Sequence, residues 1–318
     1  MKRRILITGG MGFLGGRVAQ MLSTRADVEI ILGSRKKQFS PSWLTCAHVV
    51  AMDWFSQKSL ILACEGVDTV VHLAAMNDSE CLNNPVSALE VNGVNTARLV
   101  EAAKISGVRR FIYFSTAHVY GPKLVGRIDE STLPNGPHPY ATSHRAAEDV
   151  VLAANAHFVS IVLRLSNSFG VPATPGVNAW MLLTNDLCKQ AVTLRCMTLR
   201  SSGLQQRDFV SLHDVARVVD HMLELPSTKV GSGLFNVGSG QSMRVIDMVE
   251  LIQTRCTTLL NFTPEIIRLQ SAKNEKNPDL DYRIDKLLNT NFILNGNASS
   301  EIDAILLMCS ENFNQLIA

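Results

Sequence analysis

The chain has 318 residues, of which 46% are hydrophobic and 18% charged, and its formal net charge is +2. This composition excludes an intrinsically disordered chain, and the length allows one large two-lobed unit or two domains. The small net charge and the scattered lysines and arginines argue against a nucleic-acid-binding or anionic-membrane-binding surface, so we expect no nucleic-acid and no membrane partner.

Cysteine usage and hydrophobic runs indicate a cytoplasmic protein. The seven cysteines are odd in number and none stands in Cys-x-x-Cys spacing, which argues against a disulfide framework and a zinc site. The apolar run at residues 5–8 ends at Gly9 and is too short for a signal peptide. The longest uncharged run, residues 165–185, is broken by prolines and is no membrane span. We expect no bound metal.

The first half of the chain alternates short β-branched runs with longer helical ones. Strands are predicted at residues 4–8, 28–34, 47–52, 68–75, 109–116 and 158–165. Helices are predicted between them, including a long one over residues 85–107. Strands that are apolar on both faces and alternate with helices predict an α/β fold with a parallel sheet covered on both sides.

The pattern changes after about Asn167. Prolines and glycines mark a loop-rich region, and helical stretches return near residues 182–190, 212–225 and 244–255. Internal repeats and low-complexity segments are not found. The change indicates a second structural part of the chain.

A glycine-rich turn, "TGGMGFLGG", joins the first strand to the first helix. Gly10, Gly12 and Gly15 fit G-x-G-x-x-G, and Gly9, Gly12 and Gly15 fit G-x-x-G-x-x-G. Glycine lets the backbone turn tightly and approach a pyrophosphate, which the free N–H groups of the helix N-terminus then bind. A glycine turn without a ligand is the alternative, but the strand–turn–helix context predicts a dinucleotide site.

The end of the second strand favours NADP over NAD. An NAD site places an acid there to accept hydrogen bonds from the ribose 2′-hydroxyl. This chain has Gly33, Ser34 and Arg35 there, with two lysines following, and its nearest acid, Glu29, lies at the other end of the strand. The positive charge suits a 2′-phosphate. A solvated basic turn is the alternative.

Further motifs follow along the chain. They are "VVHLAA" (Val70–Ala75), "VNGVNTARLVEAA" with Asn92, "FSTAHVYG" (Phe114–Gly121), "HPYATSH" with Tyr140, "LRLSNSFG" with Asn167, "QRDFVSLHDVA" with Arg207, and "FNVGSG" (Phe235–Gly240). Over most of Lys2–Leu251 the chain resembles the extended short-chain dehydrogenase/reductase family, especially its nucleotide-sugar epimerases, dehydratases and ketoreductases.

The resemblance implies a doubly wound parallel (Rossmann) sheet with a smaller C-terminal substrate lobe. Residues 1–166 would form the dinucleotide-binding domain, residues 167–318 mainly the substrate-binding lobe, and residues of about 207–221 would return to the first domain. Family members often dimerise through helices that include the one carrying the catalytic tyrosine, so the resemblance also implies a homodimer.

The resemblance assigns roles to particular residues. Tyr140 would transfer a proton and Thr116 would hydrogen-bond the same sugar oxygen. Substrate would be met by Arg207, at the diphosphate, and by Asn167, with His118 and Asn77 as weaker candidates. The residues expected at the cofactor, with His144, are Gly9, Gly12, Phe13, Leu14, Gly15, Ser34, Arg35, Asp53, Trp54, Leu73, Ala74, Ala75 and Asn92.

One position departs from the family. A lysine four residues after the tyrosine normally binds the cofactor ribose and lowers the tyrosine pKa, but here that position is His144. A neutral imidazole can hydrogen-bond a ribose hydroxyl yet supplies little charge. Three interpretations remain open: His144 replaces lysine functionally, the pair is impaired and the protein binds nucleotide without turnover, or Tyr140 and His144 simply pack at a helix start.

The resemblance therefore implies an enzyme of nucleotide-sugar or surface-polysaccharide metabolism. We expect NADP-dependent C4 epimerisation or 4-keto reduction of a nucleotide-linked sugar. Dehydration is disfavoured, because the Asp-Glu pair that follows the catalytic threonine in family dehydratases is replaced by Ala117 and His118. The alternative is a catalytically impaired nucleotide-binding or regulatory protein that keeps the fold.

Overall fold

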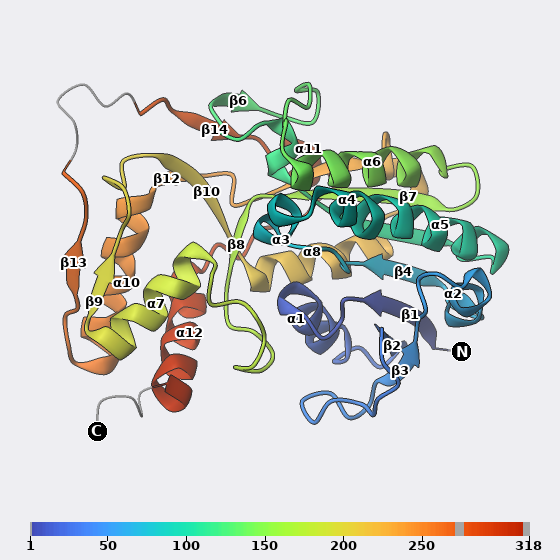
Figure 1. Cartoon of the computed structure of the whole chain (residues 1–318), viewed down its shortest axis with the longest axis horizontal. Helices are drawn as coiled ribbons and strands as arrows, with labels where there is room; N and C mark the ends of the chain where they lie inside the picture. Colours follow the sequence, from blue (N-terminus) through green and yellow to red (C-terminus); the bar gives the residue numbers. More distant parts are fainter. Residues whose placement is uncertain (1, 271–276, 314–318) are drawn as a thin grey trace.

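A seven-stranded parallel sheet is the largest element of the computed structural model, which describes residues 2–270 and 277–313. Its strand order is β11-β7-β5-β4-β1-β2-β3. The predicted α/β fold with a parallel, Rossmann-like sheet is confirmed (Figure 1). The strands are β1 (Arg3–Thr8), β2 (Val28–Ser34), β3 (His48–Ala51), β4 (Thr69–His72), β5 (Arg110–Thr116), β7 (Val159–Leu165) and β11 (Leu234–Val237).

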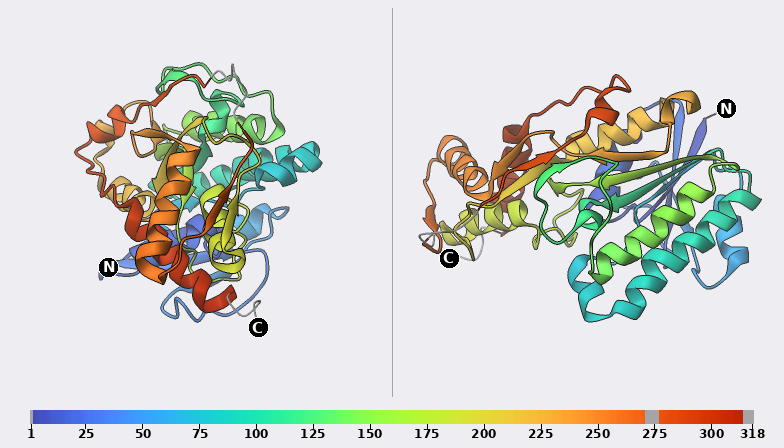
Figure 2. Two further views of the ribbon diagram at one scale, coloured as in Figure 1. Left: turned by 90° about the vertical axis from the view of Figure 1, so that its left-hand side faces the viewer. Right: turned by 90° about the horizontal axis from the view of Figure 1, so that it is seen from above.

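Alternate residues of each strand enter two separate cores. In β1, Ile5 and Ile7 belong to one hydrophobic core and Leu6 belongs to the other. Helices α1 (Phe13–Leu22) and α8 (Leu212–Glu224) cover the first face. Helices α2 (Gln57–Cys64), α5 (Asn95–Ile105) and α6 (Pro139–Ala153) cover the second. Figures 1 and 2 show this three-layer arrangement, which explains why the strands are apolar on both faces.

The seventh strand, β11, was not predicted as a strand. It has only four residues and pairs in parallel with β7, with Phe235 next to Leu163. A run this short between glycines has too little periodicity to identify from sequence alone. Residues beyond 167 therefore contribute both β11 and α8 to the larger part of the molecule.

The smaller lobe surrounds a third hydrophobic core. Helices α7 (Leu183–Leu194), α10 (Val245–Leu260) and α12 (Ala298–Phe313) pack together there. Short strands border them: β8 (Asn167–Phe169), β10 (Gln206–Ser211) and β12 (Ser242–Arg244) form one sheet, and β9 (Cys196–Thr198) pairs with β13 (Glu265–Ile267). The helices predicted near residues 182–190, 212–225 and 244–255 correspond to α7, α8 and α10.

The region predicted as one long helix over residues 85–107 is helical from Pro85 to Ile105 but contains a π-helical turn. It consists of α4 (Pro85–Ala88), a π-helical turn η1 (Leu89–Val94) and α5, and it is preceded by α3 (Asp78–Asn83). Inserted π turns are common at functional sites because they redirect side chains. The remaining elements are η2 (Ala117–Tyr120), α9 (Ser227–Val230), α11 (Asp285–Leu288), and the strand pair β6 (Gly126–Ile128) and β14 (Leu280–Tyr282). Within the described ranges, no helix is long and apolar enough to cross a membrane.

Candidate active site

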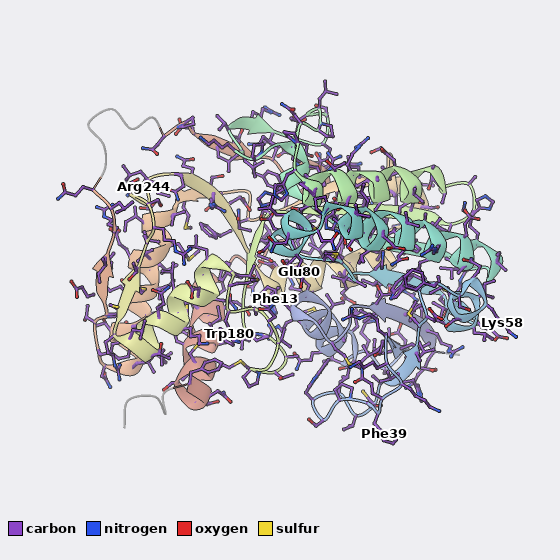
Figure 3. All side chains as sticks on the ribbon, viewed as in Figure 1. Phe13, Phe39, Lys58, Glu80, Trp180 and Arg244 are labelled. Atoms are coloured by element: carbon purple, nitrogen blue, oxygen red, sulfur yellow. The ribbon has the colours of Figure 1, made fainter. Side chains whose placement is uncertain are left out.

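A cavity of about 1460 Å³ lies between the carboxyl ends of the large sheet's strands and the smaller lobe. We call it the central cavity. Phe13 and Glu80 line it and are labelled in Figure 3, where Trp180 lies in the smaller lobe. Most predicted site residues line it: Gly9, Gly12, Phe13, Leu14, Gly15, Ser34, Arg35, Trp54, Leu73, Ala74, Ala75, Asn77, Thr116, His118, Tyr140, His144, Asn167 and Arg207. Segments far apart in sequence therefore converge on one site.

The glycine turn leaves no room for side chains. Gly9 has φ +66°, a conformation that favours glycine, and a Cβ there would lie 2.9 Å from the backbone nitrogen of Ala74. A Cβ on Gly15 would lie 2.7 Å from the Cα of Gly10. The two glycines thus bring the turn, the loop after β4 and the first turn of α1 into direct backbone contact.

Helix α1 begins at this turn without a side-chain cap. Its N-cap residue is Gly12, so the first N–H groups of the helix face the cavity without a capping oxygen. Free N–H groups at a helix N-terminus, together with the helix dipole, suit a diphosphate. The cradle shaped by Gly9 and Gly15 and this uncapped end fit the pyrophosphate of a dinucleotide.

Buried hydrogen bonds hold the loop after β4 against the glycine turn. The hydroxyl oxygen of Thr8 accepts from the backbone N–H groups of Leu73 and Ala74, both at 3.3 Å. The ring of His72, fully buried, joins Thr8 to Thr96 at 2.6 and 2.9 Å. Burial lowers the pKa of His72 to about 3, so the ring is a neutral connector. The loop is thereby fixed where it borders the cavity.

The end of β2 presents a cation and no carboxylate to the cavity. Arg35 is exposed and forms no ion pair within the described residues. Gln38 donates a hydrogen bond to the hydroxyl of Ser34 at 2.7 Å and so supports the turn. The carboxylates that line the cavity in the described part of the chain are Asp78, Glu80 and Glu90, which belong to α3 and η1.

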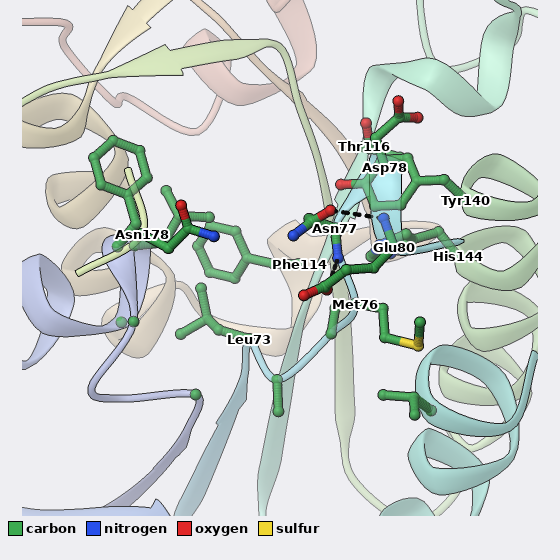
Figure 4. Close-up of a pocket in the computed structure, with 18 of the residues that line it drawn as sticks. Leu73, Met76, Asn77, Asp78, Glu80, Phe114, Thr116, Tyr140, His144 and Asn178 are labelled. Carbon is green, nitrogen blue, oxygen red and sulfur yellow. Dashed lines mark hydrogen bonds between the residues drawn. The ribbon is translucent and has the colours of Figure 1, made fainter. Parts of the chain in front are cut away.

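Tyr140 and Thr116 face each other at the other end of the cavity (Figure 4). Helix α6 starts with Pro139 in its first turn, and His138 accepts the N–H of Tyr140, which places Tyr140 at the helix start. Thr116 ends β5, and its hydroxyl oxygen accepts the N–H of His118 at 3.1 Å. Its O–H therefore remains available as a donor.

The hydroxyl of Tyr140 has a raised pKa. Burial raises the pKa of Tyr140 to about 12, a hydrogen bond with Thr116 opposes this rise, and Cys81 and Asp78 add to it. No cation is among the groups that shift this pKa. Arg145, one position after His144, turns away and pairs with Glu148 and Asp149. Tyr140 therefore keeps its proton at neutral pH.

His144 is buried beside Tyr140, with ring centroids 4.6 Å apart and planes at 74°. Its Nδ1 lies 2.7 Å from the hydroxyl oxygen of Tyr113, whereas its Nε2 has no hydrogen-bond partner among residues 2–270 and 277–313. Burial lowers the pKa of His144 to about 3. The imidazole is thus uncharged and cannot favour ionisation of Tyr140 as a lysine would.

A buried ion pair supports the strand and helix that carry these groups. Arg164 of β7 donates two hydrogen bonds to Glu148 of α6, at 2.9 and 2.6 Å, and the Ser115 hydroxyl also donates to Glu148. Both Arg164 and Glu148 are at most 1% exposed. Their mutual pairing is what allows two charges at this depth, and it connects α6 to the residue before Thr116.

Two predicted cofactor residues do not line the cavity. Asn92 is buried behind it: its carbonyl oxygen atom Oδ1 accepts from the N–H of Met76 at 2.8 Å, and its amide donates to Ser143 at 3.0 Å. Asn92 therefore supports the site and is not placed for direct contact. Asp53 is exposed and accepts the N–H of Phe55, and its contact with adenine stays a prediction.

The predicted substrate residues divide into two groups. Arg207 donates to the Asn167 side chain at 3.0 Å, and Asn167 donates to the backbone oxygen of Asp208, so these two are held together at the cavity wall. Asn77 has a structural task, because its side chain accepts the N–H of Glu80 in a capping box that starts α3 (Figure 4). Desolvation lowers the pKa of His118, which leaves it neutral.

Sequence reasoning missed several cavity residues. Asp78 and Glu80 reach it from the helix after β4, and Asn178 and Met181 reach it from the smaller lobe. The string "NDSE" at residues 77–80 is a capping-box signature and could have indicated α3. The residues of the smaller lobe carry no comparable local pattern.

Comparison with known proteins identifies the family. A family model described as "NAD dependent epimerase/dehydratase family" matches residues 5–238, and the chain belongs to this family. Among curated proteins it is similar to the dTDP-D-glucose 4,6-dehydratases of Mus musculus and Homo sapiens. Each is 29% identical over 273 residues, which cover 79% of this chain and 72% or 73% of the relative.

Solved structures share the fold over nearly the whole chain. MoeE5 in complex with UDP-glucose and NAD has a TM-score of 0.78 at 23% identity, covering 97% of this chain and 99% of that chain. UDP-glucuronic acid 4-epimerase from Bacillus cereus has a TM-score of 0.76 at 22% identity, with 97% and 99% covered. Together with the family model and the curated relatives, this confirms the extended short-chain dehydrogenase/reductase resemblance.

Proposed function

We propose that the protein reduces a 4-keto group of a nucleotide-linked sugar with NADPH, with Tyr140 as the general acid. The observation that carries this proposal is the surroundings of Tyr140: the ring of His144 packs against it where a lysine would supply charge, and burial raises the Tyr140 pKa. A protonated phenol can donate a proton to a developing alkoxide, whereas proton removal from an alcohol requires tyrosinate. This state favours reduction over the first step of epimerisation.

Tyr140, Thr116 and His144 would each have a separate role in the proposed reduction. A bound nicotinamide cofactor supplies the hydride that the carbonyl carbon accepts. Tyr140 gives its proton to the carbonyl oxygen, and Thr116, which is hydrogen-bonded to Tyr140 in the chain without substrate, donates its O–H to the same oxygen during the change. The ketone becomes an alcohol, and Tyr140 recovers its proton from solvent. His144 contacts a ribose hydroxyl of the cofactor.

Nucleotide-sugar binding is supported by the chain's cations and by its relatives. Arg207 is held by Asn167 at the cavity wall and is placed to pair with a diphosphate. Relatives carry names that refer to dTDP- and UDP-linked sugars, and MoeE5 is solved with UDP-glucose. The family extends to trifunctional plant proteins that include a UDP-4-keto-L-rhamnose-reductase, although the chain covers only 40% of that relative.

The NADP preference rests on Arg35. It is exposed at the end of β2 and has no ion-pair partner in the described ranges, so it can pair with a 2′-phosphate. The structural neighbours named above are complexes with NAD. A direct comparison of NADPH and NADH affinities decides between the two cofactors.

We also propose separate roles for the two lobes and a surface for dimer formation. Residues 1–166, with α8 added, would bind the cofactor, and residues 167–318 would mainly bind substrate in a cytoplasmic enzyme. A homodimer would form through helices that include α6. Exposed apolar side chains on the adjoining α3–η1 segment support this surface: Leu82, Val86, Leu89 and Val94.

The decisive experiment follows NADPH consumption with UDP- and dTDP-linked 4-keto sugars. Stoichiometric oxidation of added NADPH supports reduction. Conversion of a UDP-sugar to its epimer by protein that retains its cofactor, with no NADPH consumed, would support epimerisation. Tight NADPH binding without either reaction would support the catalytically impaired alternative. If Tyr140→Phe and Thr116→Ala leave turnover unchanged, the catalytic assignment is wrong.

A further inference from the structure

The two ring nitrogens of His144 have different surroundings. Nδ1 lies 2.7 Å from the hydroxyl oxygen of Tyr113, which belongs to β5. Nε2 is buried and has no hydrogen-bond partner in the described part of the chain, although His144 lines the central cavity. A buried polar atom without a partner costs free energy unless a ligand pairs with it. The unpaired nitrogen is itself closed to solvent, so a ligand in the cavity can pair with it only after a small shift of the neighbouring side chains.

The hydroxyl of Tyr113 determines the direction of the hydrogen bond. Tyr113 is 2% exposed, and His144 is its hydroxyl's partner among the described residues. Burial raises the pKa of Tyr113 well above its ordinary value, so the proton stays on the phenol. If the imidazole donated from Nδ1, this proton would have no acceptor, at a cost of about 1–3 kcal/mol. Tyr113 therefore donates to Nδ1.

Neighbouring rings fix the orientation of the imidazole. Tyr140 packs against it at 4.6 Å and 74°, and Tyr113 lies at 5.9 Å and 33°. Because the ring is neutral, it carries a single proton. With Nδ1 occupied as an acceptor, that proton is on Nε2, and the orphaned atom is a hydrogen-bond donor.

We propose that Tyr113 is a positioning residue that fixes the Nε2–H tautomer of His144 and so presents a neutral N–H donor to a ribose hydroxyl oxygen of the cofactor. This inference rests on the proposed cofactor site. It gives His144 a role that differs from a lysine's: the chain keeps the hydrogen bond to the ribose and gives up the charge. Tyr113 acts through His144 and does not itself touch the reacting atoms.

Imidazole nitrogen spectra of the free protein test the tautomer directly. In protein labelled with ¹⁵N-histidine, we expect the His144 signals to show an unprotonated Nδ1 and a protonated Nε2. Loss of these signals in His144→Gln identifies them among the eight histidines. In Tyr113→Phe we expect a shifted Nδ1 resonance. A protonated Nδ1 in the unaltered protein overturns the proposal.

Cofactor affinity tests the consequence. We expect Tyr113→Phe to weaken NADPH binding about three- to tenfold, as for loss of one orienting hydrogen bond. In a His144→Gln background the same substitution has no effect, because an amide N–H₂ needs no tautomer. Tyr282→Phe is the matched control: Tyr282 is 1% exposed and donates to the backbone oxygen of Arg164, away from His144.

The outcomes separate this inference from the proposed function. If the tautomer is as expected and Tyr113→Phe weakens NADPH binding only when His144 is present, the inference holds even without turnover. If Tyr113→Phe weakens binding equally in the His144→Gln background, or no more than Tyr282→Phe does, the inference fails. A chain that binds neither NADPH nor NADH contradicts the proposed function, and the tautomer still decides the direction of the Tyr113 hydrogen bond.

Discussion

The two ends of the central cavity are built from different parts of the polypeptide. At the end formed by the glycine turn, backbone makes the site: Gly9 and Gly15 permit close approach, and the uncapped α1 offers N–H groups. At the end formed by β5 and α6, side chains make it, and their protonation decides what they can do. Backbone geometry survives changes in neighbouring side chains, whereas the chemistry of Tyr140 depends on its burial and on the side chains around it.

The variant with the largest expected effect tests the end of the cavity formed by β5 and α6. Tyr140→Phe removes the only proposed acid, and we expect the rate of 4-keto-sugar reduction to fall about 10²- to 10⁴-fold, the usual contribution of a positioned acid. NADPH affinity should change little, because the glycine turn is untouched. Steady-state NADPH oxidation and NADPH titration measure the two quantities. A rate within a factor of two of the unaltered protein would assign proton transfer to another group.

The variant with the next largest expected effect tests the end of the cavity formed by the glycine turn. Gly15→Ala places a Cβ against the turn, 2.7 Å from Gly10 Cα, and the turn must shift. We expect NADPH binding to weaken about a hundredfold, because small displacements of a positioning element are costly. Gly176→Ala is the control, since a Cβ there meets nothing closer than 3.7 Å. Equal affinities for the two variants would show that the turn does not hold the cofactor.

Restoring a lysine at position 144 tests whether a nearby cation changes the chemistry of Tyr140. His144→Lys puts a cation beside Tyr140, and an adjacent opposite charge lowers a pKa by about one to three units. We expect oxidation of the alcohol product with NADP⁺ at pH 8 to rise about tenfold to a hundredfold, because more tyrosinate is present.

The pH profile of reduction shows whether the rate falls as Tyr140 loses its proton. With a Tyr140 pKa of about 12, the proton is present below that pH, so the unaltered protein should keep its reduction rate between pH 6 and 10. In His144→Lys the rate should decline within this range as pH rises. His144→Gln, which adds no charge, should keep the flat profile. Abolished activity in His144→Lys with NADPH still bound would mean that the imidazole has a role that charge cannot replace.

The smallest expected effect concerns cofactor choice. Arg35→Ala removes the cavity-lining cation that follows β2, and we expect about tenfold weaker NADPH binding with NADH binding unchanged. Lys58→Ala, on the exposed surface of α2, should change neither (Figure 3). Stronger or unchanged NADPH binding by Arg35→Ala would argue for NAD as the natural cofactor.

By itself, the sequence determined the fold class and the backbone end of the site. Alternation of strands and helices predicted the parallel sheet, and the glycine spacing predicted the turn, because both depend on local periodicity and on the absence of a Cβ. The motif order also predicted the family. It identified His144 as the departure from the family but left its protonation open.

Only the tertiary structure decided the properties that depend on surroundings. Burial keeps His144 neutral and Tyr140 protonated, and Tyr113 became a partner of His144 only through the packing of β5 against α6. Asn92 likewise became a supporting residue once its neighbours were known. A pKa and a hydrogen-bond direction are set by groups distant in sequence, so local pattern carries no information about them.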